Sequence, residues 1–256
     1  MTQNSPTKVA FVAGSSRGIG KAIARALLRE NYKTMITGRD SASLQLTSQE
    51  FTKEFGAEVL EFSGDLTKPP IIHQAFEKVK SSGSSSIDVL VVNLGSGKGR
   101  MGWDLADEDW TAAFDVNFWA PVRICHAAIP VLSPGASITF VSSIAGRERL
   151  PAPLPYCAAK AALINYAKNL SWAVEERGIR VNCIAPGNVL FPGGSWEQHL
   201  QSRREDVLEY VHSEVAMKRF GTPEEIADTV VFLASSKASF ITGSCFVVDG
   251  GQSRSI

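Results

Sequence analysis

The segment VAFVAGSSRGIG, residues 9–20, predicts the fold of this 256-residue chain. Its first five residues are apolar and β-rich, and three glycines follow in the spacing GxxxGxG. Beyond them, Ile23 and Leu27 share one face of an amphipathic helix. A strand, a glycine turn and a helix N-terminus form a phosphate cradle, because the turn lets backbone N–H groups approach a pyrophosphate. The expected cofactor contacts in this turn are Gly14, Ser16, Arg17, Gly18, Ile19 and Gly20.

Apolar runs of strand length recur between helical stretches along the rest of the chain. They cover residues 9–13, 34–37, 59–62, 89–92, 137–141, 181–184 and 245–248. This alternation predicts a Rossmann-like, doubly wound α/β fold, with a parallel sheet of about seven strands and helices on both faces. Length alone allows one or two domains, and we expect residues 1–256 to form a single one.

One segment, residues 188–215, interrupts the alternation and is longer than an ordinary connection. It contains Pro192-Gly193-Gly194 and then a polar helical stretch from about Trp196. We expect it to be a substrate lid, with Phe191 and Trp196 as its apolar face and the glycines as its hinge. The alternative is a helix that is packed permanently on the body.

Composition excludes several classes of protein. Lysine plus arginine equals aspartate plus glutamate, at 26 each, so nothing favours nucleic acid or an anionic membrane surface as a partner. The polar N-terminus, residues 1–8, lacks the apolar core of a signal peptide, and we expect a cytoplasmic protein. The four cysteines are far apart and the four histidines are scattered, which favours free thiols and no catalytic metal.

The end of the second expected strand bears on the choice of cofactor. NAD enzymes offer an acidic residue to the ribose hydroxyls about twenty residues beyond the glycines, whereas NADP enzymes need a cation there. Gly38 occupies this position and Arg39 follows it. We expect Arg17 and Arg39 to bind a 2′-phosphate, which gives a preference for NADP(H). The alternative is an NAD enzyme in which both arginines are solvated and Asp40 reaches the ribose.

A tyrosine and a lysine stand four residues apart at the start of a helical stretch, as Tyr156 and Lys160. This spacing places both side chains on one helix face. Ser143, at the end of a strand, lies 13 residues before Tyr156. Taken alone, a pair with this spacing is a weak signal.

Taken in order along the chain, these residues resemble the classical short-chain dehydrogenases/reductases, and most closely the members similar to 3-oxoacyl-(acyl carrier protein) reductases. The match runs from Gly14 to the ending Val248-Asp249-Gly250-Gly251. The resemblance implies further cofactor contacts at Asp65, Leu66, Asn93, Gly95, Tyr156, Lys160, Pro186, Gly187 and Val189. It implies a catalytic set of Ser143, Tyr156, Lys160 and Asn117.

The chemistry accounts for these residue types. Reduction of a carbonyl needs a hydride on carbon, which the nicotinamide supplies, and a proton on oxygen. An ammonium about 4 Å from a phenol, at an effective dielectric of about 20, lowers the pKa of the phenol by about 3 units before any effect of burial. Lys160 fits that role for Tyr156, and the resemblance implies that it also holds the nicotinamide ribose. Ser143 can hydrogen-bond the substrate oxygen, with Ser142 as the alternative serine. Asn117, by resemblance, completes a proton relay through a water beside Lys160, and helix packing is the alternative.

Three stretches depart from the family pattern. Val92-Asn93-Leu94-Gly95 replaces Asn-Asn-Ala-Gly, which removes one side-chain hydrogen bond between central strands. The basic loop Ser96–Arg100 lies near the expected active-site mouth, either as a solvated loop or as a contact for an anion. Phe191 stands where the family often has a threonine that hydrogen-bonds the cofactor. Trp103 and Trp110 either line the substrate pocket or pack in the core.

The leading hypothesis is an NADP(H)-dependent oxidoreductase that interconverts a carbonyl and a secondary alcohol, a ketoreductase of the 3-oxoacyl type among the options. One alternative is an NAD-dependent dehydrogenase of a polyol, sugar or steroid alcohol. Another is a nucleotide-sensing scaffold without catalysis, which the presence of both Tyr156 and Lys160 disfavours. By analogy with the family, we expect a homotetramer or dimer, assembled through the long helices after the fourth and fifth strands and the C-terminal strand region.

Overall fold

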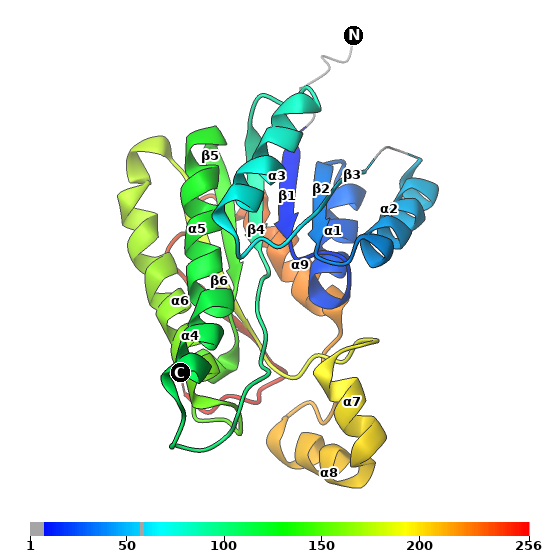
Figure 1. The fold of residues 1–256 in the computed structure, drawn as a ribbon, viewed down its shortest axis with the longest axis vertical. Helices are drawn as coiled ribbons and strands as arrows, with labels where there is room; N and C mark the ends of the chain where they lie inside the picture. Colours follow the sequence, from blue (N-terminus) through cyan, green and yellow to red (C-terminus); the bar gives the residue numbers. More distant parts are fainter. Residues whose placement is uncertain (1–7, 57–58, 256) are drawn as a thin grey trace.

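The computed structural model describes residues 8–56 and 59–255. Within these ranges, seven parallel strands form one sheet in the order β3-β2-β1-β4-β5-β6-β7 (Figure 1). The strands are β1 (Val9–Ala13), β2 (Lys33–Gly38), β3 (Leu60–Ser63), β4 (Ile87–Val92), β5 (Leu132–Val141), β6 (Arg180–Pro186) and β7 (Cys245–Val248). All seven predicted strands and the doubly wound α/β fold are confirmed. The N-terminal residues 1–7, on which the expectation about a signal peptide rested, lie outside the described residues.

Helices cover both faces of the sheet. One core layer joins the sheet to α1 (Gly18–Arg29), α2 (Ser41–Phe55) and α9 (Pro223–Ala234). The other joins it to α3 (Pro69–Ser81), α5 (Ala120–Ala128) and α6 (Leu154–Ala173). Because both faces are covered, the apolar strand β1 is buried along its whole length.

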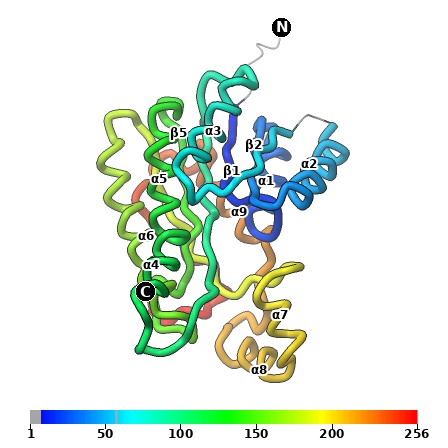
Figure 2. Tube along the Cα trace, viewed as in Figure 1, coloured from blue at the N-terminus to red at the C-terminus, as the bar shows by residue number. Residues whose placement is uncertain are grey.

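Three more helices lie toward one end of the molecule. The helix α4 (Asp107–Phe114) precedes α5, with a π-helical turn, Asp115–Trp119, between them. The predicted lid contains α7 (Ser195–Ser202) and α8 (Arg204–Glu214), which lie beyond the carboxyl ends of the strands (Figure 2). Among the described residues, no helix has the length and apolar composition to span a bilayer.

The order of the strands reverses direction between β1 and β4. The chain proceeds from β1 to β2 and β3 on one side, and then crosses to β4 on the other side. In open α/β sheets, ligands bind beyond the carboxyl ends of the strands at such a point. Ala13 of β1 and Val92 of β4 are in register here, so the glycine turn and Asn93 follow side by side.

Candidate active site

The glycine turn is held tightly against the residue that follows β4. The side-chain amide of Asn93 donates a hydrogen bond of 2.8 Å to the carbonyl oxygen of Gly14. A Cβ on Gly20 would lie 2.0 Å from that oxygen, so only glycine fits there. The helix α1 begins without a side-chain cap, which leaves its first N–H groups available to a pyrophosphate. This cradle therefore fits the dinucleotide that the sequence predicts.

Two threonines, which the sequence analysis did not single out, position the glycine turn. The Thr37 hydroxyl accepts a hydrogen bond of 2.9 Å from the Gly14 N–H at the end of β2. The Thr47 hydroxyl on α2 donates one of 3.0 Å to the carbonyl oxygen of Ser16. Both threonines are buried. The sequence offered one sign of such a role, a polar residue at the end of a buried strand. This sign applies to Thr37 and not to Thr47.

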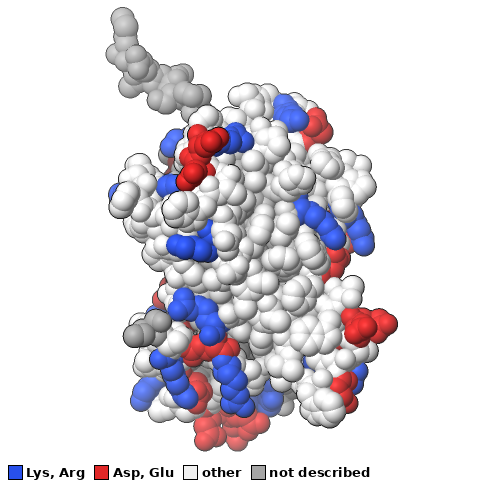
Figure 3. All heavy atoms as spheres, turned by 90° about the vertical axis from the view of Figure 1, so that its left-hand side faces the viewer, with Lys and Arg blue, Asp and Glu red and all other residues white. Residues whose placement is uncertain are grey.

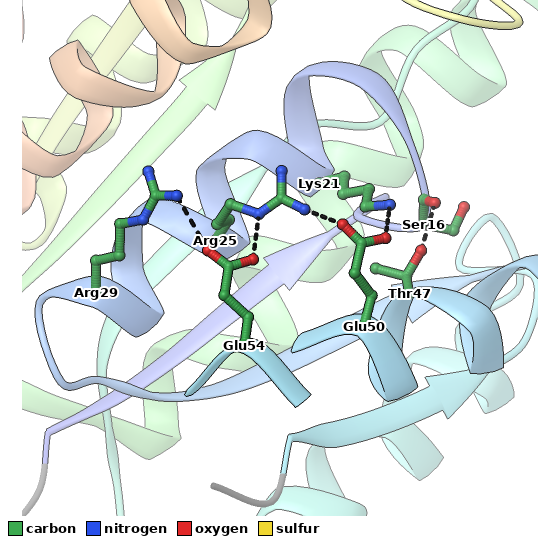
Figure 4. Close-up of polar contacts among 7 residues, drawn as sticks. All are labelled: Ser16, Lys21, Arg25, Arg29, Thr47, Glu50 and Glu54. Atoms are coloured by element: carbon green, nitrogen blue, oxygen red, sulfur yellow. Dashed lines mark hydrogen bonds and ion pairs between the residues drawn. The ribbon is translucent and has the colours of Figure 1, made fainter. Parts of the chain in front are cut away.

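Figure 4 shows that α2 is held on α1 by a ladder of ion pairs beside this turn. Arg25 pairs with both Glu50 and Glu54, Lys21 pairs with Glu50, and Arg29 pairs with Glu54. Residues four apart lie on one face of a helix, so three cations on α1 alternate with two carboxylates on α2. The ladder fixes the helix that carries Thr47 and thereby supports Ser16.

The residues that were expected to choose the cofactor lie around the end of β2. Arg39 is exposed, and Arg17 is exposed with its guanidinium 3.2 Å from the Gly193 carbonyl oxygen. Asp40 caps α2, because its carboxylate accepts a 2.6 Å hydrogen bond from the Ser43 N–H. One oxygen of Asp40 is therefore engaged by the helix, which weakens the support for the NAD alternative. Burial raises the pKa of Asp65, but hydrogen bonds from Thr67 and the charge of Arg39 lower it to a net value below the ordinary one.

The candidate acid, Tyr156, lies in the first turns of α6, and Ser143 lies just beyond β5. Burial raises the pKa of Tyr156, and a hydrogen bond with Ser143 partly opposes that rise. Ser143 also caps a short turn by accepting a 3.1 Å hydrogen bond from the Ala145 N–H. Ser142 instead is buried and donates a 2.9 Å hydrogen bond to the Lys160 carbonyl oxygen, which ties α6 to β5. The contact with the phenol therefore favours Ser143 over Ser142.

Lys160 is buried, with 3% of its surface exposed. Its ammonium nitrogen lies 3.0 Å from the Val141 carbonyl oxygen and 3.4 Å from that of Leu94. It is 6.0 Å from the centre of the Tyr156 ring. Burial lowers the pKa of Lys160 to about 8.

The expectation that Lys160 brings the pKa of Tyr156 down is wrong for this structure. The pKa of Tyr156 is raised, mainly because burial disfavours the phenolate. The Lys160 ammonium lies against two carbonyl oxygens instead. A phenol with a raised pKa stays protonated at neutral pH. It can therefore donate the proton that carbonyl reduction requires.

Asn117 joins the catalytic region to the loop Ser96–Arg100. It lies in the π-helical turn and is buried, and its side chain bonds both the N–H and the carbonyl oxygen of Ser96, at 2.9 and 3.1 Å. A Cβ on Gly95 would lie 2.8 Å from the Lys160 nitrogen and 2.9 Å from the Asn117 oxygen. Gly95 therefore lets the loop approach both side chains. The loop then passes the Tyr156 ring at Gly97, and Arg100 pairs with Asp109 of α4.

The lid segment contacts the glycine turn directly. A Cβ on Gly18 would lie 2.5 Å from the Phe191 ring, so that ring rests on the start of α1.

The residues after β6 are held against the end of β7. Pro186 ends β6, and the Gly187 N–H donates a 3.0 Å hydrogen bond to the Val248 carbonyl oxygen. Val189, further on, is buried. Trp196 stacks on Tyr210 at 5.7 Å, which holds α7 and α8 together. Trp103 is 87% exposed and Trp110 is 37% exposed, so neither packs in the core as one alternative proposed.

Comparison with known proteins decides the family. The model of a family described as Enoyl-(Acyl carrier protein) reductase matches residues 13–253. The chain belongs to the short-chain dehydrogenase/reductase family. As a short-chain dehydrogenase/reductase, it is an oxidoreductase that acts between C=O and CH–OH groups.

Three similar proteins match this short-chain dehydrogenase/reductase over nearly its whole length. A 3-oxoacyl-(acyl-carrier-protein) reductase of Chlamydia muridarum is 33% identical over 96% of this chain and 97% of its own length. Carbonyl reductase family member 4 of Xenopus laevis is 33% identical over 96% and 98%. The crystal structure of L-sorbose reductase from Gluconobacter frateurii, complexed with NADPH and L-sorbose, has a TM-score of 0.90 and 33% identity over 98% of each chain.

Proposed function

We propose that this chain is an NADP(H)-dependent ketoreductase in which Tyr156 donates a proton to the carbonyl oxygen of the substrate. The placement of Ser143 just beyond β5 and of Tyr156 at the start of α6, with the Lys160 nitrogen 6.0 Å from the phenol ring, carries the proposal, because it brings together an oxyanion partner and a protonated acid. A nicotinamide, when bound, supplies the hydride for the carbonyl carbon. Ser143 holds the substrate oxygen, and Lys160 places a positive charge behind the phenol.

The site residues each have a role in this proposal. The pyrophosphate cradle consists of Gly14, Ser16, Gly18, Ile19, Gly20 and Asn93. The 2′-phosphate is bound by Arg17 and Arg39. The rest of the cofactor crevice is lined by Asp65, Leu66, Gly95, Pro186, Gly187 and Val189. Asn117 fixes Ser96, and with it the loop beside Tyr156. Residues 1–256 act as one catalytic domain, with 188–215 as its lid. The engagement of Asp40 as a helix cap supports NADP(H) over NAD(H).

The test is the substitution Tyr156→Phe, which removes one hydroxyl and keeps the ring. Turnover of a carbonyl panel should fall by at least about a hundredfold, because general acid catalysis contributes that much or more. NADPH binding, followed by nucleotide fluorescence, should remain within about twofold of wild type because the cradle is intact. Ser142→Ala is the matched control for Ser143→Ala, and only Ser143→Ala should reduce turnover strongly. Full activity in Tyr156→Phe would refute the mechanism.

Substrate choice follows from the same panel. The curated relative is named as a 3-oxoacyl reductase and the solved structure as an L-sorbose reductase, so the panel includes a 3-oxoacyl thioester and a keto sugar. We propose a ketoreductase of the 3-oxoacyl type, and a higher kcat/KM for the thioester supports it. A preference for the keto sugar would overturn this choice of substrate, and turnover only with NADH would overturn the choice of cofactor.

We also propose that the chain works in the cytoplasm as a homo-oligomer, a dimer or tetramer, through the outer face of α5 and α6. Trp119 is 48% exposed and Trp172 is 70% exposed on this side. Figure 3 shows that the middle of this face carries few charged residues. Large exposed apolar patches mark interaction sites. Light scattering should show an oligomer for wild type and a smaller species for Trp172→Glu.

A further inference from the structure

Two cysteines face each other at the far edge of the sheet from the cofactor turn. Cys183 of β6 and Cys245 of β7 are in register as neighbours in a parallel pair. Residues in register on adjacent strands project to the same face. Cys183 is buried in the layer beneath α6, and Cys245 packs against the same layer while remaining half-buried. One thiol is therefore enclosed and its neighbour is accessible.

Cys245 opens into a basic cavity of about 460 Å³. Arg147 and Lys168 line this cavity with Cys245, and Ser255 lies at its edge. The positive charge of Arg147, in the same cavity, lowers the pKa of Cys245. A positive neighbour stabilises a thiolate, which is the form of cysteine that reacts. The cavity thus combines access with positive charge, and the second thiol, Cys183, lies buried beside it on the neighbouring strand.

The pKa directions of the two thiols are opposite. A hydrogen bond from Cys183, together with Arg147, lowers the pKa of Cys245 despite the effect of burial. The hydrogen bond to Cys245 and burial raise the pKa of Cys183 well above its ordinary range. Cys125 and Cys157 both have raised pKa values because of burial. Cys245 differs from the other three cysteines in this respect.

We propose that Cys245 is a peroxide-reactive modification site and that Cys183 is its resolving thiol. The Cys245 thiolate attacks one oxygen of hydrogen peroxide, so that an S–O bond forms, the O–O bond breaks and hydroxide leaves to take up a proton. Sulfur is oxidised by two electrons and the peroxide is reduced. The Cys183 sulfur then attacks the Cys245 sulfur, an S–S bond forms, the S–O bond breaks and water leaves with the Cys183 proton. Two thiols and one peroxide give one disulfide and two waters.

The spacing of neighbouring strands is compatible with this bond once the two Cβ atoms approach to within about 4.5 Å. Adjacent strands lie about 4.7–4.9 Å apart, and disulfides join residues whose Cα atoms are about 4.4–6.8 Å apart. Oxidation of these cysteines is not a step in the proposed carbonyl reduction, and no bond of a residue proposed for catalysis forms or breaks when they are oxidised. The proposal therefore stands independently of the ketoreductase mechanism.

The first test uses the wild-type protein. Treatment with a small excess of hydrogen peroxide at pH 7, followed by alkylation and mass spectrometry without reduction, should give a cross-linked peptide that joins Cys183 and Cys245. Cys157 in the same sample should stay fully alkylated and serves as an internal control. Oxidation that begins at Cys157, or no cross-link between Cys183 and Cys245 at full peroxide consumption, would overturn the proposal.

The second test uses variants to separate the two roles. Cys183→Ser should let the sulfenic acid on Cys245 accumulate, where dimedone labels it. Arg147→Gln should slow alkylation of Cys245 at pH 7 by at least about threefold, because it removes a cation that favours the thiolate. Arg149→Gln, an exposed arginine two residues on, is the matched control and should leave that rate unchanged. Equal rates in Arg147→Gln, Arg149→Gln and the unfolded wild-type chain would show that Cys245 is an ordinary thiol.

Discussion

The side chain of Asn93 donates a 2.8 Å hydrogen bond to the carbonyl oxygen of Gly14, which joins the ends of β4 and β1 at the centre of the sheet. Gly20 must be a glycine because the same oxygen lies where its Cβ would stand. One amide therefore orients the carbonyl that shapes the whole turn.

Asn93→Ala should lower the free energy of unfolding by about 1–2 kcal/mol, because it removes one hydrogen bond and leaves a partly buried carbonyl without its partner. Binding of NADPH should weaken as well, since the turn loses its anchor. Denaturant unfolding and nucleotide titration measure the two effects. Gln74→Ala on the exposed side of α3 is the control and should change neither. Unchanged stability in Asn93→Ala would contradict this role.

Thr47→Val keeps the shape of the side chain and removes the hydroxyl that bonds the Ser16 carbonyl oxygen. We expect a loss of about 1 kcal/mol, or about fivefold in the affinity for NADPH, because the turn that holds the phosphates is less constrained. Isothermal titration of NADPH measures this. Thr52→Val, exposed on the same helix, should bind NADPH like wild type. If both variants bind equally well, α2 does not position Ser16.

Arg39→Ala should weaken NADPH about tenfold to a hundredfold and leave NADH within about twofold, because a charge-assisted hydrogen bond to phosphate contributes about 1.5–3 kcal/mol. The two dissociation constants, measured side by side, give the ratio directly. Lys53→Ala removes another exposed cation, on α2, and should leave the ratio unchanged. A ratio unaffected by Arg39→Ala would assign the discrimination to another residue.

The pH dependence of reduction should follow Lys160. Burial lowers its pKa to about 8, so the ammonium is present below that value and is lost as the pH rises through it. Tyr156 has a raised pKa and stays protonated over the same range. The kcat/KM for NADPH, which reports groups in the free enzyme, should be level near pH 7 and fall up to about tenfold per unit above pH 8. A rate that is constant to pH 9.5 would show that the Lys160 charge is not required.

The sheet and most of the site could be read from local patterns. Residues 9–20 encode a buried strand, a turn that requires glycine and the start of a helix within twelve consecutive residues. Each of these features is determined by residues that are close together in the sequence. The order of Ser143, Tyr156 and Lys160 was visible through the family resemblance, and the structure places Ser143 just beyond β5 and the other two on α6. The strand β3 begins at Leu60, one residue later than expected, which is an ordinary uncertainty at the end of an element.

Contacts between distant segments could not be predicted from the sequence. The pKa of Tyr156 depends on burial, and the Lys160 nitrogen is directed to the carbonyl oxygens of Val141 and Leu94; the spacing of residues reveals neither. The roles of Thr47 and Ser96 depend on α2 and on the π-helical turn that precedes α5.

By resemblance to a family, the sequence indicated candidate catalytic side chains, and by itself it determined the alternation of strands and helices and the glycine turn. These follow from residue size, backbone freedom and periodicity, which act over a few residues. Only the tertiary structure decided that Asp40 caps a helix, that Ser143 rather than Ser142 meets the phenol, and that Cys183 lies beside Cys245. Those relations join residues far apart in the chain, and they arise from the packing of whole elements.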